Sequence, residues 1–353
     1  MFLLEYILIN LAAVLFTLLV CNIADTNRKT HSLRLKRITA RYSAALKKCK
    51  QTGDFRLPDR NIRGLKRYIG IEAFFEALKE LDLEDKQRIL LDNSNNIIRI
   101  LNKEKQPTVH AYFSYMLKDM KIQGVNGGGY GTLMIKFLYD GSVFSRENAL
   151  KSIYSFGDPE IVELAFTLLS ARGIIHNEKL ITDGLMTYPG DKEKLAARLM
   201  KHFDTLLECY RNSLINYMGL AGIEKYDDIL IKRAIKPETS INTICCITRK
   251  MNRVKSSKSF RYLVDIERRF REGGDWEPVA IAVTGLAHFP EEKVAKDILK
   301  RELISRNWYI RKNSAESLAA IGVTEKDLED IRASNDKYAN EAIHYALTRL
   351  ENV

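Results

Sequence analysis

Histidines and cysteines are the side chains best suited to acid–base, nucleophilic or metal chemistry, so their spacing comes first. The six histidines are dispersed and include no HExxH pair: His31, His110, His176, His202, His288 and His344. Cys245 and Cys246 are adjacent, whereas a tetrahedral zinc site usually needs intervening residues between paired cysteines. We interpret both cysteines as small buried hydrophobic residues. The sequence therefore predicts no catalytic residue, metal ligand or cofactor, and it favours a non-enzymatic protein.

A glycine-rich stretch at residues 124–131 is the most unusual local sequence. A loop of this kind before a helix can bind phosphate. The lysine and hydroxyl residue of a P-loop are absent, because Thr132-Leu133-Met134 follow the last glycine. No predicted strand precedes the loop, so the dinucleotide-binding fingerprint fails too. A flexible loop or a close backbone contact is the first interpretation. A partner-docking loop and phosphate binding are the alternatives.

A basic cluster between residues 249 and 271 is the clearest candidate for binding. Only Asp265 and Glu267 oppose its cations, which we assign to partner binding: Arg249, Lys250, Arg253, Lys255, Lys258, Arg261, Arg268 and Arg269. The plain interpretation is a solvated face. The functional interpretation is a surface for an acidic protein partner or a membrane.

The net charge of +11 over 353 residues suggests nucleic-acid binding until it is partitioned. Residues 25–70 carry 14 basic and three acidic side chains, whereas residues 71–353 carry 42 basic and 41 acidic ones. The excess is therefore local, and we expect no nucleic-acid partner. An apolar fraction of 46% and few prolines favour a folded, helical chain.

Residues 2–24 form an apolar stretch whose one charge is Glu5. As a helix it would span roughly 34 Å at about 1.5 Å per residue, against a bilayer core of about 30 Å. No basic residue precedes it, which disfavours a cleaved signal peptide. We therefore predict a single-pass helix in the plasma membrane. Because basic residues crowd its C-terminal side, the N-terminus is expected outside and the rest in the cytoplasm.

The residues after this stretch are predicted to form a basic helix over 28–50. We expect six of its cations to contact anionic lipid headgroups: Arg28, Lys29, Arg34, Lys36, Arg37 and Arg41. Within the apolar stretch, Asn10 is either a tolerated polar residue or a contact to a membrane-embedded partner.

Internal similarity is the main indication of architecture. Four twelve-residue units begin with Asp or Asn at positions 158, 275, 307 and 336, and each has Leu at its twelfth position. Asp or Asn at the start predicts a helix N-cap. Positions four, eight and twelve then share one face. Because a helix is also predicted before each unit, for example over 291–303, the pairs are expected to stack into a solenoid.

These units resemble HEAT repeats, particularly the bacterial HEAT-like type. The closest match is Asn307-Trp308-Tyr309-Ile310-Arg311, with an apolar–Arg pair. The other units have Val162, Val279 and Asn340 where Arg is expected. The predicted fold is all-α. Its segments are a transmembrane anchor at 1–24, a basic juxtamembrane helical segment at 25–70, a helical N-terminal part or cap at 71–144, and HEAT-like repeats at 145–353.

The sequence thus predicts a non-catalytic scaffold that binds a partner protein through its solenoid. Three further candidate contact residues lie in the repeat units: Trp276, Trp308 and Arg311. The resemblance implies an accessory subunit of an integral membrane enzyme, for which a membrane glycosyltransferase making a surface polysaccharide is the preferred partner. No small-molecule substrate is identified. The alternatives are a HEAT-like DNA glycosylase, and a HEAT-like lyase or chromophore chaperone.

Overall fold

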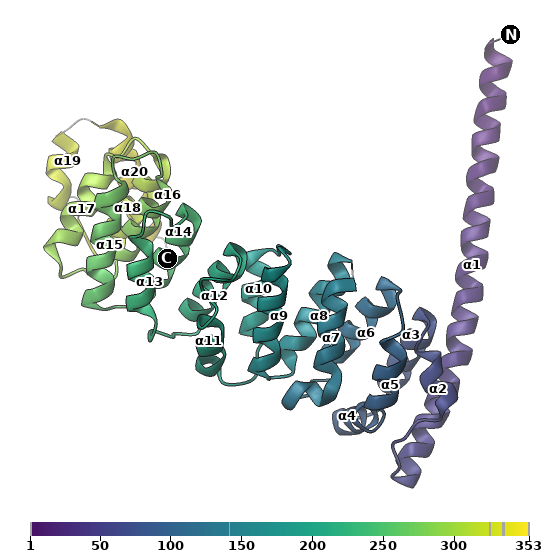
Figure 1. Cartoon of the computed structure of the whole chain (residues 1–353). Coiled ribbons are helices and arrows are strands. Elements are labelled where there is room, and N and C mark those ends of the chain that lie inside the picture. The colour runs from purple at the N-terminus through teal and green to yellow at the C-terminus, as the bar shows by residue number, and fades with distance from the viewer. Residues whose placement is uncertain (1, 141, 325, 334–335, 352–353) are drawn as a thin grey trace. The chain divides into compact units, whose positions relative to one another are not determined.

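The computed structural model describes residues 2–140, 142–324, 326–333 and 336–351, and every regular element in these ranges is a helix (Figure 1). The chain divides into two compact units. Unit 1 comprises Met1–Ala165 with Tyr188–Gly190, and unit 2 comprises Phe166–Thr187 with Asp191–Val353. The all-α prediction is confirmed for the described residues.

Unit 1 is built from two rows of helices. In one row α1, α3, α6 and α8 pack successively on one another, and in the other α2, α5 and α7 do so. The bounds are α1 (Phe2–Thr52), α2 (Asp59–Gly64), α3 (Tyr68–Leu78), α4 (Leu83–Asp92), α5 (Ser94–Leu101), α6 (Pro107–Asp119), η1 (Val125–Gly129), α7 (Tyr130–Asp140) and α8 (Val143–Ser155). Helix α9 (Pro159–Ala171) begins in this unit.

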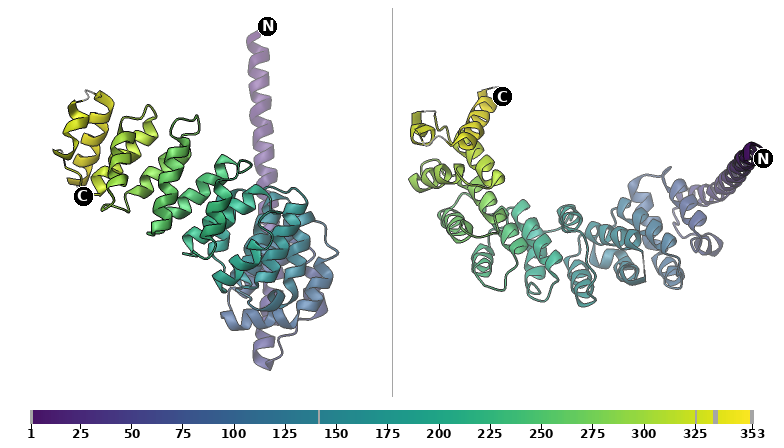
Figure 2. Two further views of the ribbon diagram at one scale, coloured as in Figure 1. Left: turned by 60° about the vertical axis from the view of Figure 1, so that its left-hand side comes forward. Right: turned by 90° about the horizontal axis from the view of Figure 1, so that it is seen from above.

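Unit 2 repeats the same arrangement, and its two rows can be followed in Figure 2. Helices α10, α12, α14, α16, α18 and α20 stack in one row, and α11, α13, α15, α17 and α19 each pack on the even-numbered helix that follows. The bounds are α10 (Glu178–Met186), α11 (Lys192–Met200), α12 (Glu208–Leu220), α13 (Asp227–Ala234), α14 (Ile241–Met251), α15 (Ser257–Phe270), α16 (Glu277–Leu286), α17 (Lys293–Leu303), α18 (Trp308–Ala320), η2 (Lys326–Leu328), α19 (Glu329–Ala333) and α20 (Lys337–Glu351). Within each unit the helices therefore form an α-solenoid.

The repeat pattern read from the sequence has a physical counterpart in the structure. Asn307 accepts hydrogen bonds from the amides of Tyr309 and Ile310, and Asp336 caps α20 in the same way. The fourth positions of the units are buried: Ile161, Pro278, Ile310 and Ala339. Burial of an isoleucine side chain, as at positions 161 and 310, contributes about 1.5–3 kcal/mol. Asp275 differs, because α16 begins two residues later without a side-chain cap.

A polar ladder joins two neighbouring helices of one row in each unit, α6 with α8 and α16 with α18. In unit 1, Asn148 donates to the carbonyl oxygen of Ala111 and Ser152 to that of Ser114. In unit 2, Asn313 donates to the carbonyl oxygen of Ala280 and Ser317 to that of Val283. The same Asn-x-x-x-Ser spacing thus makes the same pair of contacts in both units. Each bond satisfies a polar side chain at the helix interface and fixes the register of the stack.

The prediction of a transmembrane helix over residues 2–24 is wrong. In the part of the chain that the structure describes, no helix is both long and apolar enough to cross a membrane. Residues 2–24 instead begin one continuous helix, α1, which runs on through the basic segment to Thr52. The predicted single-pass localisation in the plasma membrane and the predicted orientation were deduced from that helix, so these two predictions are wrong as well. The side chains of residues 2–15, 18, 19 and 22, including Asn10, lie outside the described residues.

The C-terminal part of α1 is the first helix of the unit 1 solenoid. Tyr42, Leu46 and Cys49 are buried where α1 packs against α3, and the Tyr42 hydroxyl donates to the carbonyl oxygen of Asn61 at 2.7 Å. Neither Pro nor Gly interrupts residues 2–52. The helix ends at Gly53, whose φ of +70° suits glycine.

The glycine-rich stretch makes a close backbone contact. Asn126, Gly127 and Gly128 all have left-handed backbone angles, and the Gly124 amide donates to the carbonyl oxygen of Phe156. A Cβ atom on Gly127 would lie 2.5 Å from the Phe156 ring. The Asn126 amide also donates to an oxygen of Asp158 at 2.6 Å. The loop is therefore held against the end of α8 and the start of α9 within unit 1.

Candidate functional site

Helices α18 and α20 enclose a groove of about 450 Å³ on unit 2. Trp308, Arg311, Lys312 and Glu316 line it from α18, at a spacing that places them on one face. From α20 the lining residues are Tyr338, Glu341, Ala342 and Tyr345. Because α18 and α20 are neighbours in the even-numbered row, the groove follows from the solenoid stacking itself.

The groove presents aromatic side chains to solvent. Trp308, Tyr338 and Tyr345 are 55%, 63% and 61% exposed. Large aromatic groups are normally covered, and an exposed apolar cluster with a polar rim marks interaction surfaces. These rings can bury much area at little cost in side-chain entropy, because each has only two rotatable side-chain torsions.

Cations around the groove contact two of its rings, those of Trp308 and Tyr338. The Arg311 guanidinium lies 5.1 Å from the centre of the Tyr338 ring and also donates to the carbonyl oxygen of Ser305 at 2.8 Å. The Lys312 ammonium lies 5.5 Å from the Trp308 ring. Attraction between cation and ring is worth about 0.5–1 kcal/mol at exposed sites. The groove is thus preorganised.

A second aromatic contact extends this surface to α16. The Trp276 and Tyr309 rings stack with centroids 4.7 Å apart and an interplanar angle of 9°. Tyr309 also meets Trp308 edge-on at 5.0 Å. The structure therefore brings together the three candidate contact residues of the repeat units, Trp276, Trp308 and Arg311, since Arg311 belongs to the same groove. Tyr309, Tyr338 and Tyr345 were not singled out from the sequence.

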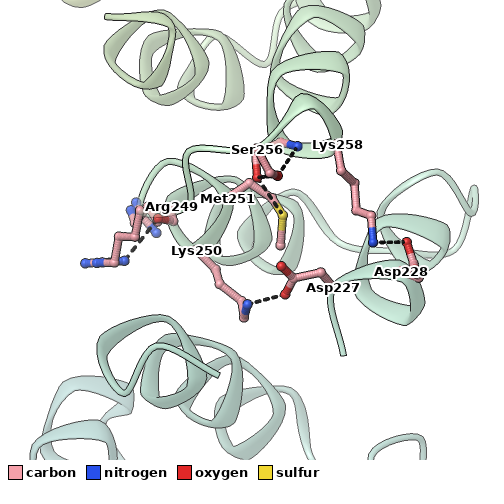
Figure 3. Close-up of polar contacts among 9 residues, drawn as sticks. Asp227, Asp228, Arg249, Lys250, Met251, Ser256 and Lys258 are labelled. Atoms are coloured by element: carbon pink, nitrogen blue, oxygen red, sulfur yellow. Dashed lines mark hydrogen bonds and ion pairs between the residues drawn. The ribbon is translucent and has the colours of Figure 1, made fainter. Parts of the chain in front are cut away.

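The basic cluster at 249–271 does not form one continuous cationic surface. Lys250 is only 1% exposed and forms a buried ion pair with Asp227, which begins α13 (Figure 3). Lys258 pairs with Asp228 at 2.8 Å on the surface, as Figure 3 also shows. Lys250 therefore belongs to the interior of unit 2.

The other cations of this cluster are exposed, and several have internal partners. Arg268 pairs with Asp265 at 2.7 Å, and Arg269 donates to the carbonyl oxygen of Ala234 at 2.8 Å. Arg253 donates to the carbonyl oxygen of Arg249 at 3.0 Å. Lys255 and Arg261 are exposed, the latter with a hydrogen bond to the Ser257 carbonyl oxygen. A role of these residues in partner binding stays a prediction.

The cations assigned to lipid contact lie along α1. Five of them are exposed: Arg28, Lys29, Arg34, Lys36 and Arg37. Arg41 is half-buried, with its guanidinium 5.5 Å from the Tyr42 ring. Contact with lipid headgroups stays a prediction for these residues, as does partner contact for Asn10.

Neither nucleophilic chemistry at Cys245 and Cys246 nor a metal centre is indicated in the described residues. Cys245 and Cys246 are buried in α14, and burial raises the pKa of Cys245 to about 12 and that of Cys246 to about 11. Both thiols are therefore protonated at neutral pH and are weak nucleophiles. No group of three or more His, Cys, Asp or Glu residues in the described ranges could hold a metal ion.

A pair of buried carboxyl groups lies between α15 and α17. Glu267 and Glu302 are 1% and 3% exposed, and Arg301 pairs with Glu267 at 2.8 Å. Burial, together with the hydrogen bond and negative charge of Glu267, raises the pKa of Glu302 to about 7. Glu302 therefore titrates near neutral pH.

Replacing Glu302 by Gln is expected to flatten the pH dependence of stability. The folded state binds the Glu302 proton more tightly, so this stabilisation is complete below the ordinary pKa of 4.5 and is lost as the pH rises through about 7. Unfolding by urea from pH 4 to 8 should show a loss of about 1–3 kcal/mol in the wild type that Glu302→Gln lacks. Glu291→Gln, at an exposed position, should keep the wild-type slope. An unchanged slope in Glu302→Gln contradicts this assignment.

Comparisons with known proteins do not place the chain in a family. No family model matches it, and neither does any curated protein. A solved structure of human deoxyhypusine hydroxylase in complex with glycerol aligns at 14% identity over 91% of this chain and 99% of that chain, with a TM-score of 0.30. A TM-score this low does not support a shared fold or a shared function. The α-solenoid arrangement rests on the helix packing of the two units.

Proposed function

We propose that this protein is a binding module, in which the groove between α18 and α20 takes an extended segment of a partner protein. The observation that carries the proposal is the exposure of Trp308, Tyr338 and Tyr345 in a groove where Lys312 lies over the Trp308 ring and Arg311 over the Tyr338 ring. Solenoids commonly use extended surfaces of stacked helices to bind proteins. In interfaces, aromatic residues of this kind contribute much of the binding free energy.

The groove favours an uncharged segment that contains proline. Its two cations, Arg311 and Lys312, are balanced by Glu316 and Glu341. Aromatic-lined grooves suit polyproline II segments because these are extended before binding and lose little entropy. The membrane glycosyltransferase predicted as a partner depended on the transmembrane helix, and it is not part of this proposal.

We also propose that the helix pairs of unit 2 are HEAT-like. The support is the capping Asn307 followed by the Ile310–Arg311 pair, in which Ile310 is buried and Arg311 donates to the carbonyl oxygen of Ser305. This adds an architectural class to the proposal and no activity.

Selection of peptides from a displayed random library tests the groove. The library is panned on the full chain after depletion on the Trp308→Ala variant, and enriched peptides are then synthesised. We expect proline-containing peptides whose affinity, measured by calorimetry, falls about 30-fold or more in Trp308→Ala. Tyr338→Ala should weaken the same peptides.

Phe144→Ala provides the matched control, because this aromatic side chain is 75% exposed, belongs to α8 of unit 1 and does not line the groove. It should leave the affinities unchanged within about twofold. Thermal unfolding followed by circular dichroism should give Trp308→Ala and Phe144→Ala the same midpoint as the wild type. Failure of the panning to enrich any peptide, or enriched peptides that bind Trp308→Ala as tightly as the wild type, would contradict the assignment of the groove.

A further inference from the structure

A second pocket, of different chemistry, lies between α11 and α13 in unit 2. Its volume is about 630 Å³. One wall is the face of α13 that carries Ile229, Lys232 and Arg233 and continues to Lys236, at a spacing that places these four side chains together. The other wall is the end of α11 and the turn after it. This pocket involves none of the residues of the aromatic groove.

The rim of the pocket is strongly basic. One carboxylate, that of Asp204, lines the pocket together with four cations: Lys201, Lys232, Arg233 and Lys236. Arg233 pairs with Asp204 at 2.9 Å, which ties α13 to the turn after α11. The three lysines form no ion pair within the described residues; Lys232 lies near Asp228, whose main partner is Lys258. The lysine charges therefore remain available to an anionic ligand.

The floor of the pocket is apolar. Phe203 is buried at its base, and Met200 and Tyr226 are half-buried beside it. Ile229 is 54% exposed at the edge, although it is a large aliphatic residue. An apolar floor inside a cationic rim is complementary to a ligand that combines negative charge with one large apolar group.

We propose that this pocket docks an acidic protein segment, with an aromatic or aliphatic side chain on the floor and carboxylates on the lysine rim. A nucleic-acid backbone matches the rim but offers no apolar side chain for the floor. The proposal adds a second binding site to unit 2, chemically distinct from the uncharged groove. One solenoid unit could thus hold two different segments at once, and their linkage would strengthen overall binding.

A fluorescent synthetic peptide, with phenylalanine at its centre and acidic residues on both sides, tests the pocket by anisotropy with the full chain. We expect a dissociation constant in the micromolar range that weakens as salt is raised. The double variant Lys232→Glu/Lys236→Glu should weaken binding at least tenfold, and Ile229→Ser about threefold or more. Trp308→Ala should leave this binding unchanged, which separates the pocket from the groove.

The matched control is Lys103→Glu/Lys293→Glu, which makes the same change in net charge at exposed positions outside the pocket and outside the basic cluster at 249–271. It should retain wild-type affinity within about twofold. Equal weakening by the two double variants, or equal binding of a peptide with alanine at its centre, would overturn the proposal by showing general charge attraction. Tighter binding of a DNA duplex or of anionic vesicles than of the peptide, lost in Lys232→Glu/Lys236→Glu, would also overturn it.

Discussion

Replacing Lys250 by alanine is expected to lower the free energy of unfolding by about 3–5 kcal/mol. The variant leaves the Asp227 carboxylate 4% exposed without its cation, and an unpaired buried charge is costly. The Lys250 stem also fills space against Gly219, where a Cβ atom would lie 3.2 Å from it. Denaturant unfolding, followed by circular dichroism, measures the loss.

Two comparison variants show that burial causes the effect. Lys258→Ala removes the neighbouring ion pair with Asp228, whose side chains are 45% and 68% exposed, and should cost less than about 1 kcal/mol. Replacing both buried partners, as Lys250→Met with Asp227→Leu, should recover at least half of the loss, because no charge is left buried. Equal losses in Lys250→Ala and Lys258→Ala would contradict the buried pair.

The loss should also be local. In stacked repeats each helix pair contacts only its neighbours, so destabilisation spreads over a short distance. Hydrogen exchange of Lys250→Ala should accelerate in α12, α13 and α14, and exchange in unit 1 should keep its wild-type rates. Uniform acceleration along the whole chain would indicate a single cooperative unit instead.

Replacing Gly127 by alanine is expected to destabilise unit 1 by about 2–5 kcal/mol. Its φ of +51° is unfavourable for any residue with a Cβ atom, at about 1–2 kcal/mol. That Cβ atom would lie 2.5 Å from the Phe156 ring, and overpacking of this kind costs about 1–3 kcal/mol more. Urea unfolding of the variant measures the sum.

A glycine of similar φ separates the two contributions. Gly53 has a φ of +70° and no atom within 4 Å of a Cβ position, so Gly53→Ala carries the backbone cost alone. Combining Gly127→Ala with Phe156→Ala should cost less than the two single changes added together, because truncation of the ring removes the overlap. Strict additivity of the two changes would be inconsistent with the contact.

The repeat helices could be predicted from the sequence where capping and periodicity agree. The helix that we expect after the capping Asn307 coincides with α18, because Asn307 supplies the cap and Ile310, Ser314 and Leu318 supply one buried face. The extent of α1 was missed for the opposite reason. The change from apolar to basic residues near position 24 suggested a boundary, yet no helix-breaking residue occurs before Gly53.

The candidate site was only partly visible in the sequence because its halves come from different repeats. Trp308 and Arg311 stood out through the repeat motif, whereas Tyr338 and Tyr345 become part of the groove only when α20 stacks on α18. Lys250 looked like a surface cation because its ion-pair partner also comes from a different helix. Its partner, Asp227, is 23 residues away on another helix, and local composition does not reveal that pairing.

The most direct test of the account is the fluorescence of Trp308 during titration with a selected proline-containing peptide. Trp276 is the other tryptophan, so Trp276→Phe leaves Trp308 as the sole tryptophan reporter. We predict a saturable change and blue shift of its emission, with a dissociation constant equal to that from calorimetry, as the peptide covers the exposed ring. Binding by calorimetry without any change in Trp308 emission would contradict the claim that the groove between α18 and α20 is the binding site.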